Sequence, residues 1–138
     1  VGQNFRDFKP MLIDKFFQEI SKVENISTDE WVMVGTSTGG IAAYNFLKQN
    51  VKPFRKLAVI PGDLQKVISS TEGWDHLDVV VAVGENDNKW KGYAENAYIK
   101  LQPVVKSISK VVLKDEGHIV SSQYDMDTVY KYLFESQE

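Results

Sequence analysis

Three side chains that can act together in acyl transfer stand in glycine-containing turns of this sequence. Ser37 lies in GTSTG, Asp87 in GENDN and His118 in EGHIV, so they follow one another as serine, acid and histidine. A serine hydroxyl becomes a good nucleophile when an imidazole takes its proton, and a carboxylate on the other ring nitrogen fixes the tautomer of that imidazole. The types and the order of these residues therefore indicate a hydrolytic triad.

The GTSTG turn has the sequence surroundings that a nucleophile elbow requires. The preceding residues 32–34 are apolar and predict a buried strand, and the residues after the turn fit one apolar stripe of a helix: Ile41, Ala42, Ala43, Phe46 and Leu47. A serine at such a tip has a strained backbone and needs small neighbours, so we expect Gly35 and Gly39 to remove colliding side chains and Gly40 to let the helix approach the sheet. The same turn can instead hold a phosphate on backbone N–H groups, or be an ordinary strand-to-helix turn.

The acid and the base of this set have alternatives. Glu85 lies in the same turn as Asp87, and Asp63 is a further carboxylate after an earlier apolar run. Asp87 can be a plain turn aspartate, and His118 can be a surface histidine. We favour His118 because it is one of two histidines and follows the last predicted strand, and we favour Asp87 as its acid.

Three other residues stand near these turns. His76 precedes a predicted strand, at the wrong end of the sheet for this chemistry, so we expect a structural role for it. Trp74 and Trp90 lie near two of the loops. Each can line an acyl pocket, but packing in the core or at the rim is the expectation that we favour.

Apolar runs and stripes predict the elements that must position these turns. We expect strands at residues 31–34, 56–60, 77–83 and 111–113, and helices at residues 5–23, after Ser37, at 90–105 and at 125–134. Pro10 is expected in the first turn of the first helix or at a break there. Residues 63–76 read as a short polar segment, and the last helix is expected to bury Met126, Val129, Tyr130 and Leu133.

An initial helix followed by strand-helix repeats, with strands that are apolar on both faces, predicts an α/β fold. We expect a parallel sheet of about four strands with helices on both faces, formed by one domain over residues 1–138. Ligands bind at the carboxyl ends of the strands in such sheets. Ser37, Asp63, Asp87 and His118 follow predicted strand ends, so the fold gathers them at one rim.

Composition excludes several kinds of function. The net charge is -3 and the isoelectric point is near 5.4, which argues against a nucleic-acid binder or a polybasic membrane surface. The sequence has no cysteine and two histidines, so we expect no disulfide, no metal site and no cofactor. It also has no apolar run of about 20 residues that could span a bilayer. Small-molecule or protein partners remain, and we favour a small-molecule ester substrate and a cytoplasmic location, although the absence of cysteine does not decide the compartment.

These turns resemble the catalytic motifs of the α/β-hydrolase fold. GTSTG is similar to the nucleophile elbow, GEND to the acid loop and EGH to the histidine loop, and the resemblance covers nearly the whole chain as the C-terminal part of that fold. The run FRDFKPMLIDKFFQEI looks like the helix before the elbow in the branch of feruloyl, S-formylglutathione and siderophore esterases. The resemblance implies Ser37 as nucleophile, His118 as general base, Asp87 as its orienting acid and the Thr38 N–H as an oxyanion donor, in an esterase that forms an acyl-enzyme.

Two departures from that fold qualify the resemblance. The usual sheet has four more strands before the first helix, and the loop that gives the second oxyanion donor belongs to them. The short connection at residues 63–76 leaves no space for a sizeable lid. Because the chain also begins with Val1 rather than methionine, we expect either a piece of a longer protein or a reduced homologue, and an open sheet edge that invites dimerisation.

Other functions are compatible with the same residues. GTSTGG is also similar to the elbow of patatin-like lipases, which use a Ser-Asp dyad without histidine, but the glycine-rich oxyanion loop and the Asp-Gly partner of that family are missing. A flavodoxin-like module can bind phosphate at residues 36–40 without catalysis. An inactive fold that serves only as an interaction surface is a third possibility.

Overall fold

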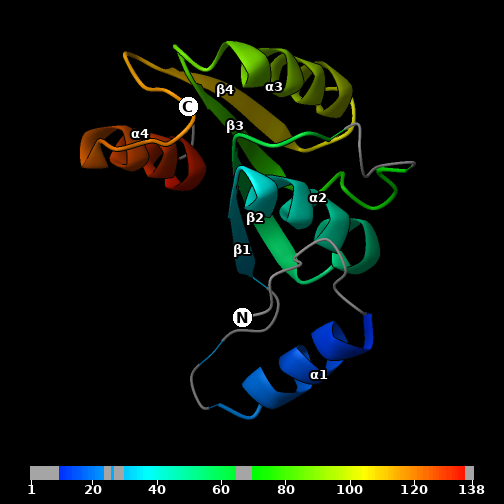
Figure 1. The fold of residues 1–138 in the computed structure, drawn as a ribbon. Coiled ribbons are helices and arrows are strands. Elements are labelled where there is room, and N and C mark those ends of the chain that lie inside the picture. Colours follow the sequence, from blue (N-terminus) through cyan, green and yellow to red (C-terminus); the bar gives the residue numbers. More distant parts are fainter. Residues whose placement is uncertain (1–9, 24–25, 27–29, 65–69, 136–138) are drawn as a thin grey trace.

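A four-stranded parallel sheet forms the centre of the molecule (Figure 1). The computed structural model describes residues 10–23, 26, 30–64 and 70–135. The strands are β1 (Trp31–Thr36), β2 (Phe54–Ile60), β3 (Asp78–Gly84) and β4 (Ser107–Leu113), in the spatial order β1-β2-β3-β4. The helices are α1 (Pro10–Ile20), α2 (Thr38–Asn50), α3 (Asn88–Leu101) and α4 (Gln123–Phe134). The predicted fold class is confirmed.

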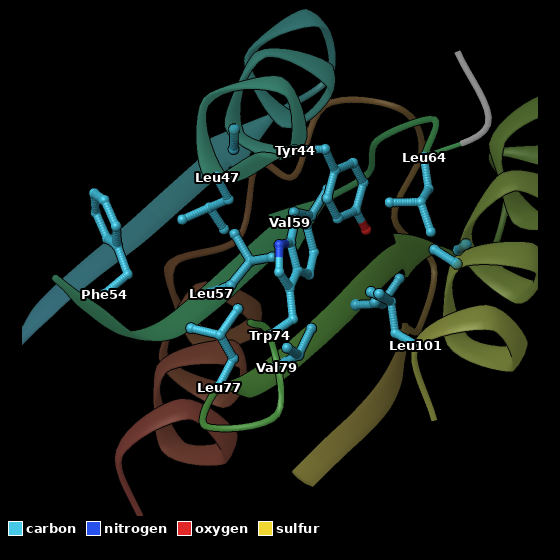
Figure 2. Close-up of a cluster of buried hydrophobic side chains, with 14 of the residues drawn as sticks. Tyr44, Leu47, Phe54, Leu57, Val59, Leu64, Trp74, Leu77, Val79 and Leu101 are labelled. Atoms are coloured by element: carbon cyan, nitrogen blue, oxygen red, sulfur yellow. The ribbon is translucent and has the colours of Figure 1, made fainter. Parts of the chain in front are cut away.

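Helices cover both faces of this sheet because its central strands are apolar on both sides. On one face, Tyr44 and Leu47 of α2 and Leu101 of α3 pack with Leu57 and Val59 of β2 (Figure 2). On the other face, side chains of α4 pack against alternate residues of the strands, and this second cluster contains Ala58, Val80, Val111, Val129 and Leu133. Alternate residues of one strand thus serve two separate cores.

The strands β1, β2 and β4 are longer than the apolar runs that predicted them, whereas β3 is shifted by one residue. β2 begins at Phe54 rather than at residue 56, because Trp31 pairs with Phe54 across the first two strands. β4 begins at Ser107 rather than at residue 111. It is an edge strand, with exposed residues at Ser107 and Lys110, so its first half carries no continuous apolar signal.

Local chemistry sets the end of α3 and the start of α4. α3 ends at Leu101 because Pro103 has no N–H to continue the helical hydrogen bonds. The prediction that it continues to Val105 was therefore wrong, and Val105 packs beside the core from the turn beyond. α4 begins at residue 123, where the Ser122 hydroxyl accepts the Asp125 N–H at 3.3 Å. The described part of the first helix has Pro10 as its first residue and ends at Ile20, whereas Phe5 and Phe8 lie outside the described residues.

Two predictions about burial need correction. Residues 63–76 are not simply polar, because Leu64 and Trp74 are fully buried in the core, where Trp74 stacks on Tyr44 with ring centroids 6.5 Å apart. This position confirms the packing role expected for Trp74. Tyr130, expected to be buried on the last helix, is 39% exposed, whereas Val129 and Leu133 are buried as predicted.

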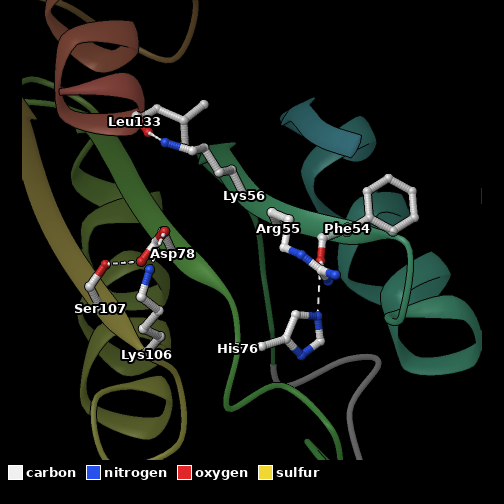
Figure 3. A network of polar contacts seen from close by, with 8 residues as sticks. All are labelled: Phe54, Arg55, Lys56, His76, Asp78, Lys106, Ser107 and Leu133. Carbon is white, nitrogen blue, oxygen red and sulfur yellow. Dashed lines mark hydrogen bonds and ion pairs between the residues drawn. The ribbon is translucent and has the colours of Figure 1, made fainter. Parts of the chain in front are cut away.

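Polar contacts join the strands at their amino ends (Figure 3). His76 Nε2 lies 2.9 Å from the Phe54 carbonyl oxygen, and Asp78 accepts the Ser107 hydroxyl at 2.7 Å. Lys56 donates to the Leu133 carbonyl at the end of α4, again at 2.7 Å. These contacts lie away from the carboxyl ends of the strands, in agreement with the structural role expected for His76.

The surroundings of the Tyr44 hydroxyl predict that its removal does not lower the free energy of unfolding. It is buried and has no hydrogen-bond partner in the described part of the chain. Burial raises the pKa of Tyr44 well above its usual range, and the nearby Asp63 carboxylate adds to this. An unsatisfied buried polar group costs about 1–3 kcal/mol. We therefore expect Tyr44→Phe to leave the free energy of unfolding unchanged or to raise it.

Urea unfolding of the wild type and the variant measures this difference. Tyr132→Phe, at a ring that is 39% exposed, is the matched control and is expected to have no effect. A loss of more than about 1 kcal/mol in Tyr44→Phe would show that its hydroxyl makes a stabilising bond.

Candidate functional site

The structure brings Ser37, His118 and Asp87 into one chain of hydrogen bonds. Ser37 Oγ lies 2.7 Å from His118 Nε2, and His118 Nδ1 lies 2.7 Å from Asp87 Oδ2. The three residues follow β1, β3 and β4, at the carboxyl ends of the sheet. With the imidazole proton on Nδ1, the carboxylate accepts that proton's hydrogen bond and Nε2 can accept the serine hydroxyl.

The backbone of Ser37 has the strained conformation expected of a nucleophile elbow. Its φ is 52° and its ψ is -118°, and it directly precedes α2. A positive φ in a residue with a side chain costs free energy and persists only where the surrounding packing enforces it. Here the Ser37 carbonyl accepts the N–H groups of Gly40 and Ile41, which ties the strained residue to the first turn of the helix.

Close packing around this turn depends on Gly35 and Gly40. A Cβ on Gly35 would lie 2.5 Å from the Gly39 carbonyl oxygen, and one on Gly40 would overlap the Pro61 carbonyl oxygen. Gly40 therefore permits the approach of α2 to the sheet, as predicted. The prediction for Gly39 was wrong, because a Cβ there would meet nothing within 4 Å.

Thr38 is the first residue of α2 and lies beside Ser37. The first N–H groups of a helix have no acceptor within the helix, and they carry its partial positive charge. The Thr38 N–H is thus available, by its place in the helix, to an oxygen atom that lies next to the serine hydroxyl.

Asp87 is held in place by the start of α3. The Asp87 residue is 7% exposed, and its carbonyl accepts the N–H groups of Trp90 and Lys91. Asp87 occupies the cap position of this helix, yet its side chain makes no capping bond there. The carboxylate bonds to His118 instead, so the helix fixes the backbone and leaves the side chain for the imidazole.

The loop after β3 and the loop after β4 are tied to each other. The Glu85 carboxylate accepts the Asp115 N–H at 3.0 Å, and the Asn86 side chain donates to the Asp115 carbonyl at 3.1 Å. A Cβ on Gly84 would overlap the carbonyl oxygens of Glu116 and Gly117. A Cβ on Gly117, directly before His118, would meet nothing within 4 Å, so the glycine that the close packing requires here is Gly84.

Trp90 packs against the imidazole. Its ring centroid lies 5.1 Å from that of His118, with 33° between the planes, and Tyr93 contacts Trp90 edge-on at 5.3 Å. Trp90 follows Asp87 by three residues, which places both on the same side of the first turn of α3. This spacing is the sequence signal that would have placed Trp90 at the histidine.

The alternative acids have other surroundings. Glu85 bonds to the Asp115 N–H, as described, and Asp63 is buried beside Tyr44. The carboxylate at the imidazole is that of Asp87. Among the described residues, no group of three metal-ligating side chains could hold a metal ion, and no helix is long and apolar enough to cross a membrane.

The close contact between Gly84 and the loop after β4 predicts that a larger residue at this position destabilises the protein. We expect Gly84→Ala to lower the free energy of unfolding by about 1–3 kcal/mol, because its methyl group would push the two loops apart. Denaturant unfolding measures the change. Gly92→Ala in α3 is the matched control: a Cβ there meets nothing within 4 Å, so that variant should gain stability by about 0.5–1 kcal/mol. A Gly84→Ala variant as stable as the wild type would contradict the contact.

No protein-family model matches the chain, and no curated protein matches its sequence. Solved structures do resemble it. A carboxylesterase from Mesorhizobium loti has a TM-score of 0.69 at 13% identity, and a Bacillus cereus carboxylesterase has 0.68 at 15%; each match covers 87% of this chain and 57% of the other chain. Fluorophosphonate-binding serine hydrolase F of Staphylococcus aureus has 0.52 at 12%, covering 88% of this chain and 60% of its own.

These likenesses concern the arrangement of the backbone. The identities are low, and this chain spans under two thirds of the length of each of those structures. The parallel order of the strands and the helices on both faces of the sheet agree with them. The described part of the chain therefore has part of the α/β-hydrolase fold, the fold of these carboxylesterases.

Proposed function

We propose that this chain carries the catalytic residues of a serine hydrolase that acts on small carboxylic esters. Ser37 Oγ attacks the acyl carbon while its proton passes to His118 Nε2, and Asp87 stabilises the resulting imidazolium through Nδ1. His118 then gives the proton to the leaving alkoxide, and an acyl-enzyme remains on Ser37. Water, deprotonated by His118, hydrolyses that ester and frees the serine.

The observation that carries this proposal is the geometry of Ser37. Two hydrogen bonds of 2.7 Å link its hydroxyl to an imidazole and that imidazole to a carboxylate, and the serine backbone is strained at a φ of 52°. A structural serine gains nothing from such strain, whereas a nucleophile gains exposure of its hydroxyl at the tip of the turn. The Thr38 N–H supports the same chemistry as a donor to the oxyanion.

The rival functions receive less support from these contacts. A patatin-like dyad uses no histidine, whereas His118 lies within hydrogen-bonding distance of Ser37 here. A phosphate-binding turn needs the N–H groups at the start of α2 but needs neither the imidazole nor the buried Asp87. The hydrolase is the function that uses all three side chains.

A fluorophosphonate probe tests the role of Ser37. Mass spectrometry should place the covalent adduct on Ser37, and Ser37→Ala should remove it, with Ser70→Ala at an exposed serine as the matched control. An adduct on another residue, or no adduct on folded protein, would refute the role of Ser37 as nucleophile. If Ser37→Ala then also binds phosphate as tightly as the wild type, the result favours a phosphate-binding module.

His118→Ala should slow hydrolysis of p-nitrophenyl acetate by several powers of ten.

We further propose that a strand from polypeptide outside these 138 residues pairs with the open edge of β1. β1 is an edge strand without a charged residue, and a groove of about 850 Å³ runs along it between Phe16 of α1, Met33 and Phe46. Val34 on the same strand is 40% exposed. Natural edge strands usually carry charge or cover, so this edge is suited to a further strand.

The proposal predicts weak activity for the 138 residues alone. One oxyanion donor is encoded beside Ser37, and the loss of a second costs about a hundredfold to a thousandfold in rate. We expect a polypeptide extended before Val1 to hydrolyse p-nitrophenyl acetate faster by about that factor and to be monomeric by light scattering. If the 138-residue chain is monomeric and turns over the ester as fast as the extended polypeptide, the proposal is wrong. If the 138-residue chain is a dimer that Val34→Lys dissociates, the edge of β1 pairs with a second copy of the chain instead.

A further inference from the structure

Glu116 is a buried carboxylate two residues before His118. It is 7% exposed, and it lies in the loop between β4 and α4. Residue types and strand ends gave no reason to select it from the sequence, where it stands among the charged residues of KDEGH. Burial of a carboxylate is unfavourable unless hydrogen bonds satisfy it, so its partners are the evidence for its role.

The Glu116 carboxylate binds the backbone that follows the histidine. One oxygen accepts the Ser122 N–H at 2.8 Å, and the other accepts the Ser121 N–H at 3.1 Å. The Ser121 hydroxyl lies 3.3 Å from the same carboxylate. The segment with His118 therefore starts at Glu116 and returns to the Glu116 side chain, which closes it into a small ring.

Both ends of this ring are anchored in the fold. On one side, the Glu116 carbonyl accepts the Asn86 N–H at 2.8 Å, which joins it to the turn that carries Asp87. On the other side, Ser122 caps α4 through the Asp125 N–H. Glu116 thus connects the loop of the acid, the loop of the histidine and the start of the last helix.

Glu116 stays ionised in this position. The N–H of Ser121, followed by that of Ser122, holds the pKa of the Glu116 carboxyl below its usual range, and this effect exceeds the opposing effect of burial. The Ser121 hydroxyl acts in the same direction. A charged acceptor makes stronger hydrogen bonds to backbone N–H groups than a neutral one.

We propose that Glu116 is a positioning residue that holds the His118 imidazole between Ser37 and Asp87. This inference rests on the proposed hydrolase function for its effect on rate. The side chain of His118 is 38% exposed, so packing by itself encloses it incompletely. The closed ring fixes the backbone on both sides of the histidine, and a displacement of about 1 Å at a catalytic group can lower a rate by about a hundredfold.

The rate of fluorophosphonate labelling measures this role without requiring fast turnover. We expect Glu116→Ala to lower the maximal labelling rate kinact by roughly tenfold to a hundredfold, with the half-saturating probe concentration KI within twofold of the wild type. The kinact of Glu116→Gln should lie between those of the wild type and Glu116→Ala, because its amide keeps one acceptor oxygen. Glu72→Ala is the matched control, at an exposed carboxylate near the amino ends of the strands.

Nuclear magnetic resonance of the histidine rings gives an independent readout. The chain has two histidines, so ¹⁵N-histidine labelling yields two ring systems, and His76→Gln identifies that of His118. We expect the His118 signals to change in Glu116→Ala while those of His76 stay in place. Retained His76 signals also show that the variant is folded.

Two results would overturn the proposal. One is a Glu116→Ala variant with wild-type kinact and unchanged His118 signals. If Glu116→Ala does not fold, a Glu116→Gln variant with wild-type kinact and unchanged His118 signals overturns the proposal in its place. The other is a fall in kinact that Glu72→Ala reproduces. If the wild type is not labelled at Ser37, the proposed function fails, and the His118 signals still decide whether Glu116 positions the ring.

Discussion

The contact between the loops after β3 and β4 is the constraint on which the site depends. The Gly84 backbone lies against the carbonyl groups of Glu116 and Gly117, at a distance that leaves no room for a Cβ. Parallel pairing carries β3 and β4 together as far as the pair Gly84 and Leu113, so both loops leave the sheet side by side. Asp87 and His118 are 31 residues apart in sequence and meet because of this pairing.

The serine comes to the same place by a separate route. β1 lies two strands away from β3, and Ser37 is directed by the strained turn into α2, which Gly40 lets approach the sheet. The core on that face, with Tyr44 and Leu47 fully buried, provides the packing that holds the strain (Figure 2). A rigid sheet and two buried clusters thus set the relative positions of three loops.

The two ends of the sheet have different kinds of polar contact. At the amino ends, His76, Asp78 and Lys56 bond to backbone carbonyls or neighbouring side chains and join strands to each other and to α4 (Figure 3). At the carboxyl ends, Ser37 and His118 keep part of their surface exposed while Asp87 and Glu116 are buried beneath them. The proposed catalytic residues thus lie at the end of the sheet opposite the contacts that join the strands.

Sequence by itself determined the α/β class and the serine turn and selected Ser37 and His118, because apolar runs, glycines and the ends of strands are local signals. It favoured Asp87 as the acid and left Glu85 as an alternative. It did not determine the length of β4, an edge strand with polar residues, or the choice of Asp87 over Glu85, which only the position of the His118 ring shows. Gly84 and Glu116 gave no local signal either. Gly84 meets the carbonyl groups of the loop after β4, and that contact exists only once the tertiary structure has paired β3 with β4. Glu116 bonds to the Ser121 and Ser122 N–H groups of its own loop, and only the folded loop brings those groups to its carboxylate.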